Sequence, residues 1–300
     1  MVSLMTTTLI LGASGYIGRH LFNGLSSNGF DVIGTYCKNK FANFANFDLE
    51  NMEIGAFVEG LGVGNIKYLV ILAARNANID DSKRFWKEVH CANVEKVKEV
   101  VDYCVQNNII PIYASTDNVF SGKKGKYAEE DRREPLNCYG RIRYEVEDCI
   151  MRSAKKYVIL RMGKVFGVEV NDGTFITDMV SSINRGSGLS YAVDQVFTPL
   201  YVEDFIDALK GIITNGYSGI FHLASMKPLT RYELATDICN FFNFRKGDIV
   251  PCKINSLGLL DARPLRIDLD ITKYKAMTGF NEKGIEHYLN LIAGNKAERL

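Results

Sequence analysis

The stretch TTTLILGASGYIG, residues 6–18, joins a short β-branched and apolar run to a turn rich in glycine. The run 6–11 predicts a buried strand, and the amphipathic segment after the turn predicts a helix. Glycines spaced as GxxGxxG between such a strand and helix are typical of a dinucleotide-binding loop, in which free N–H groups of the helix meet a pyrophosphate. We expect six residues of this turn to bind a dinucleotide: Gly12, Ser14, Gly15, Tyr16, Ile17 and Gly18.

The segment DVIGTY, residues 31–36, predicts the next strand. Sites that prefer NAD usually carry an acidic residue at the end of this strand, where it binds the ribose 2′-hydroxyl. This chain has Thr35 near that position and Lys38 shortly after it. A missing carboxylate and a nearby cation favour a 2′-phosphate, so NADPH is the expected cofactor and NADH the alternative.

Three further segments continue the pattern of strands and helices. Asp48 and Leu49 are expected to flank the adenine, although Asp48 is equally suited to capping a helix that begins near residue 50. The apolar run 67–75 predicts a third strand, and Ala73 and Ala74 are small enough to let a cofactor pass. A helical pattern then extends over about 82–106.

The segment STDNVFSGKKGKYAEEDRREPLNCYGRIR, residues 115–143, follows an apolar run that predicts another buried strand. Ser115 and Thr116 place hydroxyl groups at the end of that strand, where open α/β sheets bind their ligands. Tyr139 and Arg143 are four residues apart and share one face of a helix. A phenol beside a cation can exchange a proton with a carbonyl or an alcohol. A pair on the helix surface with no catalytic role is the plainer alternative.

The alternation of strands and helices predicts an α/β fold with a doubly wound, parallel sheet. We expect a dinucleotide-binding domain over 1–165, to which 196–224 returns. The segments 166–195 and 225–300 are expected to form a smaller, mostly helical lobe that binds the substrate.

Composition excludes several functional classes. The 36 basic and 35 acidic residues nearly cancel, so a nucleic-acid partner is not expected. The longest apolar runs fall well short of the ~20 residues that span a bilayer, so no membrane contact is expected. The 7 cysteines are scattered, which favours reduced thiols in the cytoplasm, and the 4 histidines lack metal-ligand spacing, which predicts no metal site.

Taken together, these motifs resemble the extended short-chain dehydrogenase/reductase superfamily, which has the Rossmann fold, and within it the dTDP-4-dehydrorhamnose reductase family. The resemblance covers nearly the whole chain. It rests on GASGYIG (12–18), STDNVFSGKKGKYAEED (115–131), PLNCYGRIR (135–143), LRMGKVFG (160–167), DQVFTPLYVED (194–204) and RPLRID (263–268).

The resemblance implies hydride transfer from NAD(P)H to the 4-keto carbon of a nucleotide-activated deoxysugar. It implies that Thr116 and Tyr139 hold the carbonyl oxygen, with Tyr139 as proton donor, and that Ser115 lies beside the nicotinamide. Arg143 would bind the nicotinamide ribose. A homodimer is left open. The residues that the resemblance places near the substrate are Thr116, Asp117, Val119, Gln195, Thr198 and Arg263.

The sequence departs from this family at three positions. The family motif is Tyr-x-x-x-Lys, whereas this chain has Arg143, and a guanidinium is not interchangeable with an ammonium. Asn118 replaces an aromatic residue, and Lys164 stands where the family often has tryptophan. One alternative is therefore a non-catalytic, NADP-binding regulatory subunit similar to the beta subunit of methionine adenosyltransferase. Another is a nucleotide-sugar epimerase or dehydratase. Dehydratases of this superfamily typically have an Asp-Glu pair after the site threonine, whereas this chain has Asp117–Asn118, which lacks the second carboxylate.

Overall fold

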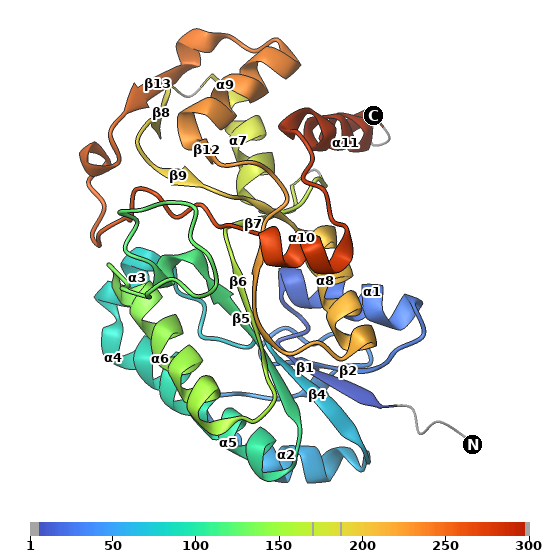
Figure 1. Ribbon diagram of the computed structural model, residues 1–300. Coiled ribbons are helices and arrows are strands. Elements are labelled where there is room, and N and C mark those ends of the chain that lie inside the picture. Colours follow the sequence, from blue (N-terminus) through green and yellow to red (C-terminus); the bar gives the residue numbers. More distant parts are fainter. Residues whose placement is uncertain (1–5, 170, 187, 298–300) are drawn as a thin grey trace. The chain divides into compact units, whose positions relative to one another are not determined.

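A computed structural model of the protein describes residues 6–169, 171–186 and 188–297 (Figure 1). The chain divides into two compact units. The first unit contains the chain up to Thr116, Asn137–Arg161 and Ile206–Phe221. The second contains Asp117–Leu136, Met162–Phe205 and the chain from His222 onward. This division assigns 117–136, 162–165, 196–205 and 222–224 differently from the boundaries expected from the sequence, which stay a prediction about separately folding domains.

The first unit is built around a seven-stranded sheet with the order β11-β6-β5-β4-β1-β2-β3. The strands are β1 (Thr7–Leu11), β2 (Asp31–Tyr36), β3 (Ala45–Asn46), β4 (Ile66–Ile71), β5 (Ile110–Thr116), β6 (Val158–Met162) and β11 (Gly219–Leu223). The neighbouring pairs from β5 to β3 run parallel, with Leu9 of β1 between Ile33 of β2 and Leu69 of β4. The order reverses between β1 and β4, and such a reversal opens a ligand crevice at the carboxyl ends of the strands. The predicted doubly wound, parallel sheet is confirmed.

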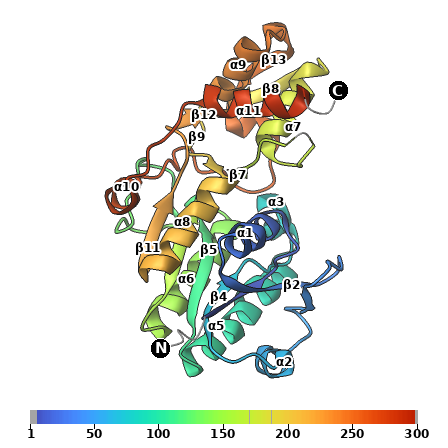
Figure 2. The ribbon, with the colours of Figure 1, turned by 90° about the vertical axis from the view of Figure 1, so that its right-hand side faces the viewer.

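Helices cover both faces of this sheet (Figures 1 and 2). On one face α2, α5 and α6 pack side by side. On the other face α1 lies against α8, where a Cβ on Gly24 would meet the side chain of Ile206. The helices are α1 (Tyr16–Ser27), α2 (Ile54–Leu61), α3 (Ile79–Arg84), α4 (Trp86–His90), α5 (Lys96–Gln106), α6 (Cys138–Ser153) and α8 (Val202–Asn215).

The prediction of a single helix over 82–106 is wrong in two respects. The chain becomes helical earlier, at Ile79, and breaks at Phe85, whose φ of −115° and ψ of 42° are not helical. The residues Cys91–Glu95 then form a π-helical turn, η1, before α5 begins. Asn93 in this turn exchanges two hydrogen bonds with the backbone of Arg75, at 2.7 and 3.0 Å. The wider π-helical turn therefore directs the side chain of Asn93 toward the loop after β4. Helical periodicity alone does not predict this orientation.

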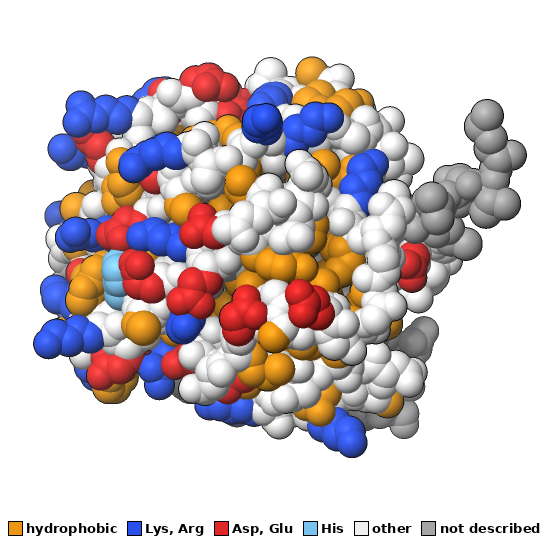
Figure 3. All heavy atoms as spheres, turned by 90° about the horizontal axis from the view of Figure 1, so that it is seen from below, with side chains coloured by type: hydrophobic (Ala, Val, Ile, Leu, Met, Phe, Trp, Pro, Cys, Tyr) orange, Lys and Arg blue, Asp and Glu red, His pale blue; other side chains and the backbone are white. Residues whose placement is uncertain are grey.

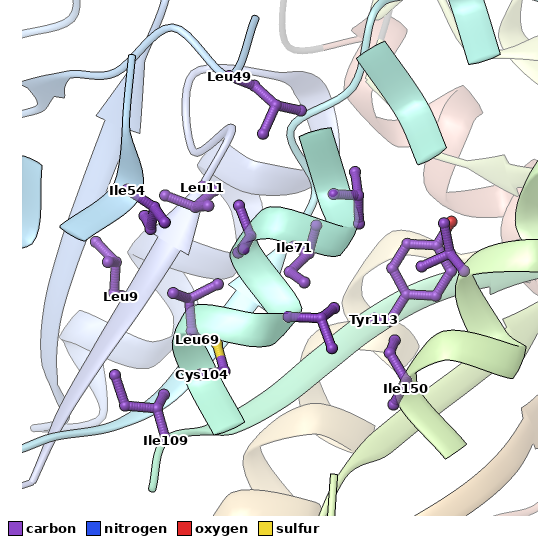
Figure 4. Packing of buried hydrophobic residues seen from close by; sticks show 14 of the residues in the cluster. Leu9, Leu11, Leu49, Ile54, Leu69, Ile71, Cys104, Ile109, Tyr113 and Ile150 are labelled. Atoms are coloured by element: carbon purple, nitrogen blue, oxygen red, sulfur yellow. The ribbon is translucent and has the colours of Figure 1, made fainter. Parts of the chain in front are cut away.

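The core of the first unit lies between the sheet and the face covered by α2, α5 and α6 (Figure 4). Alternate residues of β1 and β4 point into it, because side chains alternate across a strand. Leu9, Leu11, Leu69 and Ile71 are each almost fully buried. Tyr113 of β5 packs in the same cluster, so a phenol is held inside an apolar core at the sheet's carboxyl edge.

The second unit has a separate core, around Phe166, Ile176, Phe197, Ile238 and Tyr288. Its helices are α7 (Phe175–Asn184), α9 (Arg231–Phe242), α10 (Thr272–Thr278) and α11 (Ile285–Ala297), with 3₁₀ turns η2 (Asp117–Val119), η3 (Lys246–Asp248) and η4 (Ile254–Leu257). The described residues also form three two-stranded sheets, from β7 (Val165–Phe166), β8 (Leu189–Ala192), β9 (Val196–Phe197), β10 (Leu200–Tyr201), β12 (Leu229–Thr230) and β13 (Ile249–Cys252).

The surface seen in Figure 3 carries basic and acidic side chains close together, with apolar areas between them. This mixture agrees with a formal net charge of +1. Among the helices of the described residues, none combines the length and the apolar character that crossing a bilayer requires.

Candidate active site

The glycine turn after β1 brings two loops of the sheet into contact. Gly12 has a φ of +84°, and a Cβ at this position would lie 2.6 Å from the backbone nitrogen of Ala73. The loops after β1 and β4 therefore touch where the strand order reverses. A Cβ on Gly18 would overlap the carbonyl oxygen of Gly12, so this glycine allows α1 to approach the turn. These are the steric reasons for glycine at the first and third positions of the motif.

The amino end of α1 carries neither a side-chain cap nor a nearby negative charge on the helix itself. Gly15 is its N-cap and offers no side chain, and the first turn contains no acidic residue. The N–H groups of the first helical turn, at Tyr16 and Ile17 among others, have no acceptor within the helix. An anionic group is stabilised there by these N–H groups and by the helix dipole. The turn therefore fits the pyrophosphate of a dinucleotide.

Thr35 binds the backbone of the glycine turn through two hydrogen bonds. Its hydroxyl accepts a hydrogen bond from the N–H of Gly12 at 3.0 Å, and its carbonyl oxygen accepts one from Ser14 at 3.1 Å. The residue is only 1 % exposed. The structure thus places Thr35 under the glycine loop, where it positions the backbone of Gly12 and Ser14.

Replacing Gly12 with alanine should destabilise the protein and weaken dinucleotide binding. A left-handed conformation costs a residue with a Cβ roughly 1–2 kcal/mol, and the contact with the backbone of Ala73 adds to this strain. Urea denaturation measures the loss, and titration with NADPH measures binding. The matched control is Gly60→Ala within α2, where the added methyl group meets nothing within 4 Å and should stabilise the helix. A Gly12→Ala variant as stable as the wild type would contradict the steric argument.

The remaining residues expected around the adenine lie in different environments. Leu49 is buried in the first core (Figure 4). The carboxylate of Asp48 accepts hydrogen bonds from the N–H of Glu50 at 3.0 Å and from Asn51 at 2.9 Å. These bonds hold the pKa of Asp48 below its usual value. Asp48 therefore closes a turn, whereas α2 begins later and is capped by the carboxylate of Glu53.

Lys38 and Ala74 are exposed, and Ala73 is half-buried. Lys38 follows β2 at the end of the strand, where the cofactor's ribose is expected to lie. Ala73 and Ala74 follow β4 in the loop that touches the glycine turn. These positions agree with the geometry that the sequence motif requires, and their contact with a cofactor stays a prediction.

The helix α6 carries Tyr139 and Arg143 on one face, as their spacing predicts. Asn137 caps the helix by accepting a hydrogen bond from Gly140 at 2.8 Å. The guanidinium carbon of Arg143 lies 5.3 Å from the centre of the Tyr139 ring and 5.6 Å from that of Tyr113. Its Nη1 donates to the hydroxyl of Tyr113 at 3.1 Å. The cation is therefore held against two phenols.

Burial and charge act in opposite directions on this group. Burial by itself lowers the pKa of Arg143, but the two phenols outweigh it and the pKa is raised, so the guanidinium is charged at any physiological pH. Burial raises the pKa of Tyr113, against the opposing effect of Arg143. The Nε of Arg143 is buried and has no hydrogen-bond partner in the described part of the chain. This unsatisfied donor fits a ligand hydroxyl, as the ribose of a dinucleotide would supply.

A buried ion pair supports the end of β5. Ser115 donates a short hydrogen bond to the carboxylate of Glu147, which is 0 % exposed. Arg161 of β6, 1 % exposed, binds the same carboxylate through Nε at 3.1 Å and through Nη2 at 2.8 Å. Such a fork is well matched to a carboxylate. Ser115 is thus held by a buried carboxylate. Thr116 is the next residue and ends the strand.

The residues expected near the substrate fall in the second unit, apart from Thr116. Gln195 donates to the carbonyl oxygen of Pro264 at 3.2 Å, and Thr198 accepts from the N–H of Leu269 at 3.3 Å. The segment 263–269 therefore runs along 195–198, which brings Arg263 close to Gln195. The carboxylate of Asp117 accepts from Asn118 at 2.8 Å. Val119 is fully buried and offers no exposed surface to a ligand.

Comparison with known proteins identifies the family. The model of the RmlD substrate binding domain family matches residues 5–294. The chain belongs to this family. The predicted resemblance to dTDP-4-dehydrorhamnose reductases is therefore confirmed at the level of the family.

The curated proteins similar to this chain include a reductase and a subunit of methionine adenosyltransferase. The dTDP-4-dehydrorhamnose reductase of Aggregatibacter actinomycetemcomitans is 28 % identical, over 96 % of this chain and 98 % of the relative. The methionine adenosyltransferase 2 subunit beta of Danio rerio is 24 % identical, over 90 % and 84 %. The crystal structure of the Bacillus anthracis reductase in complex with NADP has a TM-score of 0.83 and 21 % identity, over 97 % of this chain and 100 % of that one. This likeness shows the shared fold.

Four residues of the site in this RmlD-family chain were missed by the sequence analysis. They are Asn93, Tyr113, Glu147 and Arg161. Glu147 had a local signal, since it follows Tyr139 and Arg143 at intervals of four on the same face of α6. Arg161 had one too, because it interrupts the apolar strand VILRM. Nothing local distinguishes Tyr113 from the other buried residues of β5. In the described residues, no cluster of three or more histidine, cysteine or acidic side chains is arranged to hold a metal ion.

Proposed function

We propose that this chain is an NADPH-dependent reductase of the 4-keto group of a nucleotide-activated deoxysugar. The observation that carries the proposal is the buried guanidinium of Arg143, held beside the phenol of Tyr139 on the helix that follows β5. A proton donor next to a fixed positive charge suits the reduction of a carbonyl group, because the charge stabilises the phenolate that proton transfer leaves. Membership of the RmlD family supports the same reaction.

The residues available for the cofactor lie in the first unit. We propose that the glycine turn and the first N–H groups of α1 bind the pyrophosphate, and that Lys38 binds the 2′-phosphate. The unsatisfied Nε of Arg143 would donate to a hydroxyl of the nicotinamide ribose. When bound, the cofactor supplies the hydride. The absence of an acidic residue at 35–38 supports NADPH, with NADH as the alternative.

The chain's own residues perform the proton chemistry in this proposal. The hydroxyls of Thr116 and Tyr139 hold the carbonyl oxygen, and Tyr139 gives its proton as the oxygen becomes an alkoxide. Glu147 and Arg161 act indirectly, because they fix Ser115 and so the end of β5. Gln195, Thr198 and Arg263 of the second unit are proposed to contact the sugar nucleotide.

Purified protein should oxidise NADPH when it is mixed with at least one dTDP- or UDP-linked 4-keto-6-deoxysugar. The loss of NADPH absorbance measures the rate, and mass spectrometry of the product should show a gain of two hydrogen atoms. The control is the same sugar nucleotide without the 4-keto group, which cannot accept a hydride. Binding of NADPH without turnover on any sugar of the panel would contradict the proposal.

A second candidate function is that of a non-catalytic regulatory subunit. Two observations favour it: the relative from Danio rerio is named as a methionine adenosyltransferase subunit, and Arg143 replaces the family's lysine. Stoichiometric co-purification with a methionine adenosyltransferase from the same cell, together with absent turnover, would decide for this function. An epimerase or dehydratase would instead release tightly bound NAD⁺ when the purified protein is denatured.

A further inference from the structure

Two cations of the second unit lie over the same aromatic ring. The Nζ of Lys164 is 5.4 Å from the centre of the Phe175 ring, and the guanidinium carbon of Arg231 is 4.7 Å from it. Arg231 also lies 4.2 Å from the ring centre of Phe197. Ring faces attract a cation and hold the planar guanidinium in one orientation. Lys164 follows β6 and Arg231 begins α9, so residues far apart in the sequence build this pair.

Neither cation is neutralised by direct contact. Within the described residues, no carboxylate lies within ion-pair distance of Lys164 or Arg231, although Asp178 attracts Lys164 and Asp117 attracts Arg231 from farther away. Burial lowers the pKa of Arg231 to about 10. Partial burial and repulsion from Arg231 lower the pKa of Lys164, although this side chain still reaches the surface. Arg231 is still charged at neutral pH. An anion bound at this pair would offset the repulsion between the two cations and the cost of their partial burial.

The pair is close to Asp117 and Thr198, two residues of the second unit that are expected near the substrate. A Cβ on Gly163, the residue before Lys164, would overlap the carbonyl oxygen of Thr198 and lie 3.3 Å from Oδ2 of Asp117. Asp117 is joined by a peptide bond to Thr116. Lys164 is exposed, so an incoming molecule can reach it. The anion that the pair would bind therefore belongs to the sugar nucleotide for which these two residues are expected contacts.

We propose that Lys164 and Arg231 form an anion subsite that selects a nucleotide sugar with a carboxylate on the sugar or on one of its substituents. This inference rests on the proposed function, which supplies the nucleotide sugar as the substrate class. A guanidinium binds a carboxylate through two parallel hydrogen bonds, and an ammonium adds a third contact. The carboxylate would lie between the two cations and offset their repulsion.

Calorimetric titration with UDP-glucuronate and UDP-glucose tests the subsite, because the two probes differ by one carboxylate. The wild type should bind UDP-glucuronate about tenfold more tightly than UDP-glucose or better. The variants Lys164→Met and Arg231→Met should each reduce this preference to about twofold or less, with the affinity for UDP-glucose unchanged. Lys227→Met, which changes an exposed lysine of the same unit, should keep the full preference.

Several outcomes overturn the inference. Equal affinity of the wild type for both probes, including failure to bind either, shows that the carboxylate is not recognised. Equal weakening of both probes and of UDP alone in the variants assigns the cations to the diphosphate instead. Retention of the preference in both variants also excludes the pair. Arg231 contacts two aromatic rings, so circular dichroism should confirm that Arg231→Met is folded before its binding is compared, and the exposed Lys164→Met provides an independent test of the pair.

Different results would contradict the proposed reductase activity and the proposed anion subsite. Absent NADPH oxidation with every 4-keto sugar would contradict the reductase but leave the preference for UDP-glucuronate intact. Reduction of a neutral 4-keto sugar by both the wild type and the variants, without that preference, would retain the reductase and exclude the subsite.

Discussion

Replacing Tyr139 with phenylalanine should lower kcat for the 4-keto sugar by about 10²–10⁴-fold, since the variant lacks the proton that the developing alkoxide must receive. The ring remains, so its contact with the Arg143 guanidinium at 5.3 Å is preserved. The affinity for NADPH should therefore change by no more than about twofold. Single-turnover kinetics measure the chemical step, and fluorescence titration measures the cofactor.

Tyr217→Phe is the matched control for this variant. Tyr217 precedes β11, and the N–H of the nearby Gly219 binds the carbonyl oxygen of Tyr157, just before β6. It therefore lies at the amino ends of the strands, at the opposite edge of the sheet from Thr116. This control should retain full activity. If the Tyr139→Phe variant kept the wild-type kcat, Tyr139 would not be the proton donor. Only the cofactor site of the first unit would then remain as a proposal.

Replacing Glu147 with alanine should lower the free energy of unfolding by about 3–5 kcal/mol, because it leaves the guanidinium of Arg161 charged, buried and without its carboxylate. The effect is large because both side chains are almost fully buried, and because Ser115 loses its acceptor at the same time. Urea denaturation followed by circular dichroism measures the change.

The same helix provides a control at its surface. The exposed Arg152 of α6 binds Asp148 at 2.7 Å, and Arg152→Ala should cost at most about 1 kcal/mol. The double variant Glu147→Leu, Arg161→Met should recover most of the lost stability, since a buried pair can be replaced by apolar groups of similar size. A loss below about 1 kcal/mol for Glu147→Ala would show that Arg161 finds another partner or reaches water.

The structure shows which contacts Arg143 makes at the position of the family's lysine. Its guanidinium is long enough to bind the hydroxyl of Tyr113 while it remains beside Tyr139. One more donor, Nε, remains unsatisfied. The arginine thus keeps the positive charge at the phenol and retains a free hydrogen-bond donor. The sequence indicates the charge, but the partner on β5 becomes evident only in the folded chain.

The long helix expected over 82–106 shows where sequence patterns mislead. The apolar stripe at Val97, Val100 and Val101 correctly predicts α5, because residues three and four apart share a face. The same pattern does not reveal the π-helical turn before it, since a single widened turn disturbs the periodicity very little. The bonds between Asn93 and Arg75 link a helix to a loop, and no local spacing encodes them.

The sequence by itself determined the alternation of strands and helices, the glycine turn after β1 and the shared face of Tyr139 and Arg143. These features depend on side-chain periodicity and allowed backbone angles, which act over a few residues. Only the tertiary structure decided that Tyr113 binds Arg143, that Glu147 pairs with Arg161, and that Lys164 and Arg231 lie over one ring. The physical reason is that burial and electrostatic pairing depend on which elements pack together, and packing joins residues whose separation along the chain carries no information about their contact.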